Sequence, residues 1–154
     1  MGDADTLYQE LQADFNLISC PLFELAEMHL RKRDQFLPFG AILDDNGGIG
    51  IQAATSGAEF ESSLEVLPVL QSGLRAIIEE GGISAIGICE WVKITQEGSE
   101  QTDAMKVLVE HKRGLTVAFY VPCQKDVVSG WAFEEMFARQ AEPEVRGWDL
   151  KEAS

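Results

Sequence analysis

The second half of the chain contains three strand-like runs in succession, and this feature constrains the fold more than any other. Residues 83–96, 103–112 and 115–122 are rich in β-branched and aromatic side chains, and the middle run alternates apolar with polar residues. Only a loop at 97–101 and a turn at 113–114 separate them. Short connections of this kind join neighbouring antiparallel strands, so we expect a three-stranded meander.

An Asn-Gly turn predicts a separate β-hairpin upstream. The segment FLPFGAILDDNGGIGIQA places Asp45-Asn46-Gly47-Gly48 between apolar runs at 37–44 and 49–55. Asn and Gly both accept the positive φ that a tight hairpin turn requires. The aspartates resemble the start of a calcium loop, but the distal bidentate Glu is absent, and no Lys-Ser or Lys-Thr pair follows to hold a phosphate. We therefore expect a turn that binds no metal.

Apolar residues at helical spacing predict three helices before the meander. The first covers about residues 4–18, and the sequence at 19–21 ends it, because its proline disfavours a helical conformation in the preceding residue. A second helix follows over about residues 22–33, and a third over about residues 62–80. We also expect a short helix at 133–139 after the meander.

The element order is α-α-β-β-α-β-β-β, and it predicts an α+β fold with one antiparallel sheet of about five strands and helices on one face. This order resembles the profilin-like and roadblock-like arrangements, and the resemblance is one of topology. We expect a single domain over residues 1–142 and a loosely attached tail at 143–154. The predicted core is one apolar cluster: Phe39, Ile42, Leu70, Leu74, Ile77, Ile86, Ile88, Val107 and Phe119.

Composition and charge exclude several classes of function. The chain has 154 residues and a formal net charge of −14, and an acidic surface of this kind repels nucleic acid. No apolar run approaches the length of a membrane span, and the acidic N-terminus is unlike a secretory signal. The cysteines at 20, 89 and 123 show no zinc-ligand spacing and are expected to be reduced. We expect a cytoplasmic protein with no metal, no cofactor, and no nucleic-acid or membrane partner.

The candidate site residues fall into two groups, and none is assigned as catalytic. If the strands on either side of the 97–101 loop pair, Glu90 and His111 fall on one face and could line a ligand pocket. Glu110 points to the other face, as neighbours on a strand do. The alternative is that His111 is a partly exposed residue at a strand end. The candidate interface is formed by three aromatic residues of the C-terminal part: Trp131, Phe133 and Trp148.

Two segments resemble a group of small, uncharacterised bacterial single-domain proteins. That group carries an aromatic-x-Pro-Phe-Gly-Ala segment, matched here by Phe36-Leu37-Pro38-Phe39-Gly40-Ala41. It also has a Thr-Asp-Ala entry to a strand that ends in Glu-His, matched by Thr102-Asp103-Ala104 and Glu110-His111. The resemblance covers about residues 30–125 and implies a single-domain α+β fold. It implies no activity and no catalytic residue.

Two classes of function follow from these observations. The first is a non-enzymatic protein-interaction module, of which an inhibitor or immunity-like protein that neutralises a basic partner is one concrete form. The second is a small-ligand sensor or enzyme with a pocket near Glu90 and His111. The strand-like segments at 49–55 and 115–121 contain no charged residue, so their edges need cover. We expect a homodimer formed through a sheet edge or the aromatic tail, or else a monomer whose own tail covers that edge.

Overall fold

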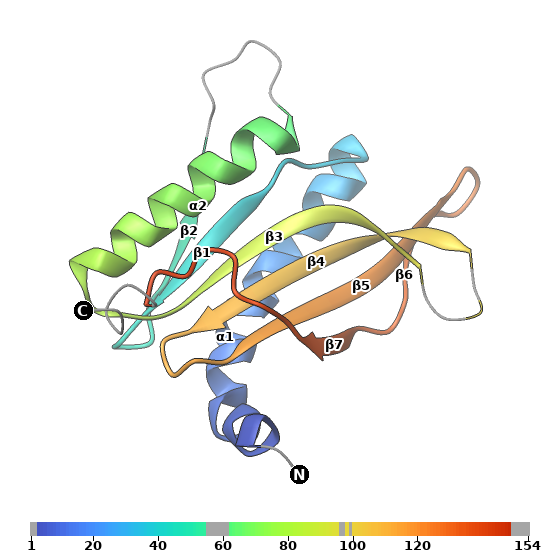
Figure 1. The fold of residues 1–154 in the computed structure, drawn as a ribbon. Helices are drawn as coiled ribbons and strands as arrows, with labels where there is room; N and C mark the ends of the chain where they lie inside the picture. The colour runs from blue at the N-terminus through green and yellow to red at the C-terminus, as the bar shows by residue number, and fades with distance from the viewer. Residues whose placement is uncertain (1–2, 55–61, 96–97, 99, 149–154) are drawn as a thin grey trace.

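Two helices pack on opposite faces of one antiparallel sheet in the computed structural model, which describes residues 3–54, 62–95, 98 and 100–148 (Figure 1). The helices are α1 (Asp3–Arg33) and α2 (Ser63–Glu80). The strands are β1 (Phe39–Asp44), β2 (Ile49–Gln52), β3 (Ile83–Thr95), β4 (Gln101–His111), β5 (Thr116–Asp126), β6 (Gly130–Phe133) and β7 (Phe137–Gln140). Their order in the sheet is β2-β1-β3-β4-β5-β6, and β7 also pairs with β5. The predicted α+β fold with a single antiparallel sheet is confirmed.

The meander and the hairpin are both present as predicted. Strands β3, β4 and β5 pair antiparallel in succession, and β1 pairs antiparallel with β2. In the hairpin turn Gly47 has a φ of 88°. The Asp44 side chain accepts the backbone N–H groups of Asn46 and Gly48 at 2.8 Å each. The carboxylate at the start of this loop therefore holds the turn in shape.

Helix α1 is continuous, so the break predicted at 19–21 is wrong. The helix runs through Pro21, which lacks the backbone N–H that the helix ladder would use there. On either side of the proline, Ile18 and Leu22 are fully buried against the sheet. A side chain at Gly87 on β3 would lie 2.9 Å from Leu22, so the glycine lets the helix approach closely. Tertiary packing of this stripe outweighs the local cost of the proline.

The sheet has seven strands rather than about five. The segment predicted as a helix at 133–139 instead contributes the end of β6 and the start of β7. These two short strands pair one after the other with the same edge of β5, which is otherwise open. The backbone groups of that edge are satisfied by pairing, and this favours strand over helix for a segment with weak preferences.

The two helices cover different faces, so the expectation of helices on one face is wrong. Residues along β3 alternate: Ala85 and Cys89 pack with α1, whereas Ile86 and Ile88 pack with α2. The predicted single core therefore divides into two. Phe39, Val107 and Phe119 belong to the α1 side; Leu70, Leu74, Ile86 and Ile88 belong to the α2 side, where Ile42 and Ile77 are only partly buried. A central strand that is covered on both sides needs apolar residues on both.

Residues 143–148 form a strap that crosses the α2 side of the sheet (Figure 1). The buried Glu110 carboxylate on β4 accepts the backbone N–H groups of Glu144, Val145 and Arg146 at 2.8–2.9 Å. Arg75 Nε on α2 donates to the Val145 carbonyl at 2.8 Å. The first six residues of the segment expected to be a loose tail are therefore held against the domain; residues 149–154 lie outside the described residues.

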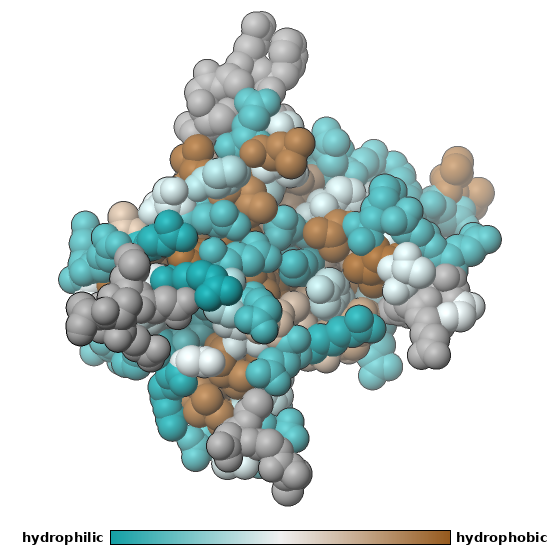
Figure 2. Space-filling view, viewed as in Figure 1, coloured by the Kyte–Doolittle hydropathy of each residue, from teal (hydrophilic) through white to brown (hydrophobic). Residues whose placement is uncertain are grey.

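Figure 2 views the same α2 side and shows a mainly hydrophilic surface on which apolar atoms gather in separate patches. Among the residues described here, no helix combines the length and the apolarity that a bilayer span requires.

Candidate functional site

The structure does not bring Glu90 and His111 together. In the β3–β4 ladder Glu90 lies opposite Lys106, whereas His111 lies opposite Ala85, five residues before Glu90 on β3. The side chain of His111 faces α1, where its Nε2 is 2.9 Å from Asp14 Oδ2. Glu90 lies on the α2 side with Lys106. A shared pocket around Glu90 and His111 therefore has no geometric basis.

Glu90 is nevertheless an unusual carboxylate. It lies half-buried on the α2 side, and burial raises its pKa above the ordinary value of a glutamate. The nearby charge of Lys106 opposes this increase, and that of Glu144 adds to it. Lys106 Nζ lies 3.6 Å from the Glu144 carboxylate, so the strap supplies the second acid of a Glu–Lys–Glu row. This row connects the strap to the sheet.

The aromatic residues of the predicted interface do not form one surface. Trp131 and Phe133 on β6 stack on each other, and Trp131 meets Trp91 edge-on at 5.7 Å between ring centroids. The Trp131 indole N–H donates to Asp34 at 3.1 Å, just beyond the end of α1. Trp148 instead packs on the α2 side of the sheet. Trp131 and Phe133 thus attach β6 to α1, and Trp148 helps to seat the strap.

The three cysteines do not provide a reactive thiol paired with a base. Burial raises the pKa of the Cys89 thiol well above its ordinary value, and it raises the pKa of Cys123 to about 11. Both thiols are therefore protonated near neutral pH. Cys20 is exposed on α1 and belongs to no cluster. In the part of the chain that the structure describes, no group of three His, Cys, Asp or Glu residues could hold a metal ion.

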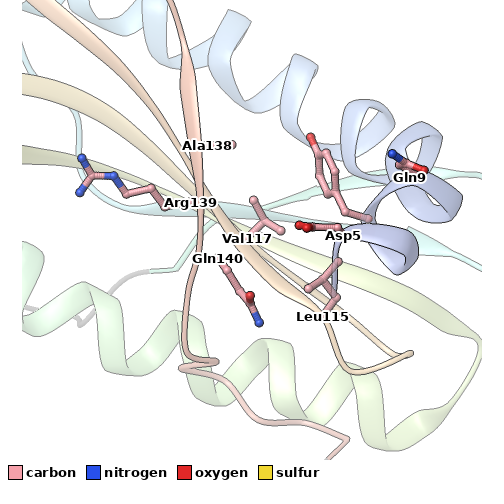
Figure 3. A pocket seen from close by; sticks show the side chains of 8 residues that line it. Asp5, Gln9, Leu115, Val117, Ala138, Arg139 and Gln140 are labelled. Carbon is pink, nitrogen blue, oxygen red and sulfur yellow. The ribbon is translucent and has the colours of Figure 1, made fainter. Parts of the chain in front are cut away.

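A hollow with an apolar floor lies between the first turns of α1 and strands β5 and β7 (Figure 3). We call it the α1–β7 hollow; its volume is about 370 Å³. The eight residues that line it are Asp5, Tyr8, Gln9, Leu115, Val117, Ala138, Arg139 and Gln140. The floor is apolar, since Leu115 and Val117 are buried beneath it. Polar groups lie mainly at its rim.

The lining side chains differ in their direction. Figure 3 shows Val117, Leu115 and Asp5 around the hollow, whereas Arg139 points away from it. The Arg139 guanidinium lies 5.1 Å from the centre of the Phe137 ring, on the α2 side of the sheet. The hollow therefore offers an apolar floor, one carboxylate, two amides and the phenol of Tyr8. This set suits the binding of a side chain and contains no nucleophile with a base.

Strand β7 borders the hollow and has one unpaired edge. It pairs with β5 from Val117↔Gln140 to Tyr120↔Phe137. Within the described ranges no strand pairs with its other edge, so backbone N–H and C=O groups of alternate residues point outward there. The sequence contains no clear signal for this feature, because Phe137–Gln140 has no β-branched residue and its spacing suits a helix.

Searches against protein-family models, curated proteins and solved structures found no match for this chain. The function of the chain is therefore inferred from the α1–β7 hollow and from the open edges of the sheet.

Proposed function

We propose that the chain is a non-enzymatic protein-interaction module that binds an extended segment of a partner protein. The segment adds to the free edge of β7 and places one apolar side chain in the α1–β7 hollow. The observation that supports this proposal is that an unpaired strand edge lies directly beside an apolar hollow. In this mode of recognition, backbone hydrogen bonds supply affinity and the hollow selects the side chain.

Charge favours a basic partner. The chain carries a net charge of −14, and Asp5 lies at the rim of the hollow. A field of this sign attracts cationic segments and accelerates their encounter with the protein. The partner segment therefore contains a large apolar residue with lysine or arginine nearby. An inhibitor or immunity-like protein that neutralises a basic partner is the form of this function that the charge favours.

The fold topology, the resemblance to small bacterial proteins and the cellular location are compatible with this proposal. The element order is comparable with the profilin-like and roadblock-like arrangements, which host unrelated functions, so it adds no activity. The resemblance to small uncharacterised bacterial proteins rests on the segment at 36–41 and on Thr102-Asp103-Ala104 with Glu110-His111, and it stays a proposal. A cytoplasmic location agrees with three unpaired cysteines, which persist in a reducing compartment.

A random peptide library displayed on phage tests the proposal. We expect the immobilised chain to enrich peptides that combine one large apolar residue with basic residues. Ala138→Arg places a long side chain in the hollow and should weaken binding of an enriched peptide at least about tenfold. The affinity should also fall as salt is raised, because the attraction is electrostatic.

Ala132→Arg is the matched control. Ala132 is exposed on β6, opposite Gln124, and the substitution adds the same charge and volume at the same edge of β5 but away from the hollow. It should leave peptide binding unchanged. Failure to enrich any peptide family, or equal binding by the two variants, would contradict the proposed function.

A further inference from the structure

The other end of the sheet is also an open edge, and it differs from β7 in chemistry. Strand β2 is terminal in the strand order and pairs only with β1 among the described residues. Its sequence, Ile49-Gly50-Ile51-Gln52, contains no charged residue. Edge strands in natural proteins are protected by charge, proline, a bulge or a covering element. This strand has no charged residue or proline.

The α1 face of this edge is apolar. Ile49 and Ile51 point to the same face as Ala41 and Leu43, which pack against α1. Yet Ile49 and Ile51 are 37% and 47% exposed, because α1 packs mainly on β1, β3 and β4 and does not reach far enough to cover β2. Two β-branched residues are thus held in a strand with one side in water, an arrangement that favours further burial.

The α2 face of the same edge is also uncharged. A hollow of about 190 Å³ lies between β2 and α2, and the described residues that line it, among them Gln52, Val69 and Ile77, are all uncharged. Val69 is 44% exposed at this place. Among the described residues, nothing lies within 4 Å of the position a Cβ at Gly73 would occupy. Strand β2 and the described lining of this hollow therefore include no charged side chain.

We infer that this edge is occupied by a second copy of the chain, with the β2 strands of the two copies paired antiparallel about a two-fold axis. A copy of this chain also carries −14, so it is repelled wherever acidic surfaces would meet. It approaches most readily through a surface with little charge, and β2 and the described lining of the hollow beside it include no charged residue. A basic partner would instead be drawn to acidic regions such as the rim at Asp5.

A two-fold axis also suits the composition of the edge. An isologous contact places the same patch on both sides, and an uncharged apolar patch is complementary to itself. The opposite edge, that of β5, is already covered by β6 and β7 of the same chain. Trp131 and Phe133 pack against the α1-side core of the same chain. Of the edges considered from the sequence, β2 is therefore the one that a second copy covers.

Sedimentation velocity over a range of concentrations tests this inference. We expect the full chain to sediment as a dimer and Ile51→Lys to sediment as a folded monomer, since the substitution places a charged side chain on each of the two paired β2 strands. Val128→Lys is the matched control: Val128 is 94% exposed between β5 and β6, and the substitution adds the same charge. This variant should remain a dimer.

If Ile51→Lys fails to fold, disulfide cross-linking through an introduced cysteine tests the β2–β2 contact instead. In a Cys20→Ser background, Ile51→Cys should form a disulfide-linked dimer on mild oxidation, and Val128→Cys should not. A full chain that remains monomeric at every concentration, an Ile51→Lys variant that remains a dimer, or equal cross-linking of the two cysteine variants would overturn the inference. None of these outcomes bears on peptide binding at the α1–β7 hollow, so the two proposals fail separately.

Discussion

At the scale of single residues, Glu110 shows how one buried carboxylate attaches a distant segment. It is 2% exposed, and its two oxygens accept three consecutive backbone N–H groups of the strap. Ordinary side chains cannot satisfy three neighbouring donors at once, whereas an ionised carboxylate has the lone pairs to do so. His111, the next residue, faces the opposite side of the sheet and contacts Asp14. Glu110 and His111 are adjacent in sequence, yet one binds the strap on the α2 side of the sheet and the other contacts α1 on the opposite side.

Glu110→Ala should destabilise the protein. The change leaves the buried Val145 N–H without an acceptor and removes two further charge-assisted bonds, so we expect a loss of roughly 2–4 kcal/mol in the free energy of unfolding. Urea denaturation measures the loss, and hydrogen exchange should show faster exchange at residues 144–146. Glu144→Gln is the control, because Glu144 makes only partly exposed contacts and should cost less than about 1 kcal/mol. A loss for Glu110→Ala as small as that of the control would contradict this role.

Glu90 should make stability depend on pH in a defined direction. Its folded-state pKa is raised, so the folded protein holds this proton more tightly than the unfolded chain does. The contribution of Glu90 is thus most favourable below the unfolded value of 4.5 and is lost as pH rises through the folded pKa. Above the folded pKa, where Glu90 is ionised in both states, the burial of its charge opposes folding.

Glu90→Gln removes that ionisation with little change of shape. We expect the melting temperature of the variant to exceed that of the parent at pH 7, and the difference to shrink toward zero near pH 4. Thermal melts of both proteins across this range measure it. A variant that is less stable than the parent at pH 7 would show that the Lys106 contact outweighs the burial of the charge.

At the scale of elements, α2 is held by a narrow apolar stripe. Leu70, Leu74 and Ile78 are almost fully buried against Ile86 and Ile88 of β3. The helix covers only part of its face of the sheet, and the strap covers the adjoining part. Since few residues connect α2 to the sheet, each should matter strongly.

Leu74→Ala should cost roughly 2–5 kcal/mol, because it removes buried methyl groups and leaves a cavity between α2 and β1–β3. Val69→Ala on the same helix is the control; Val69 is 44% exposed, and its truncation should cost less than about 1 kcal/mol. Chemical denaturation of both variants compares them. Equal losses would mean that α2 does not pack through the stripe that contains Leu74.

At the scale of the whole molecule, the net charge of −14 acts on every contact. Like charges on a compact chain repel one another, and folding brings them closer together. Raising sodium chloride from about 20 mM to about 0.5 M shortens the screening length severalfold, so we expect the melting temperature to rise. Choline chloride should produce a similar rise, because screening does not require a bound metal cation. A melting temperature that does not change with either salt would show that repulsion is not a significant cost.

Local chemistry in the sequence was sufficient for the elements with short-range signals. The turn at Asn46-Gly47 closes a hairpin because Gly47 accepts its φ of 88°, and β3–β5 form a meander because their connections are short. The buried face of α2 follows from a local pattern too, because its apolar residues recur at the spacing of one helical face. Each of these depends on residues that are close together in the chain.

Only the tertiary structure decided the features that depend on partners distant in sequence. Helix α1 continues through Pro21 because its flanking residues are buried against the sheet, a gain that no local pattern reports. The spacing of apolar residues at 133–139 suits a helix, yet the ends of this segment form strands because they pair with the edge of β5. Glu90 and His111 lie apart because their positions follow from the register of β3 and β4 and from the faces that two helices cover. The α1–β7 hollow exists only where α1, β5 and β7 meet, and residues that are more than one hundred positions apart in the chain line it.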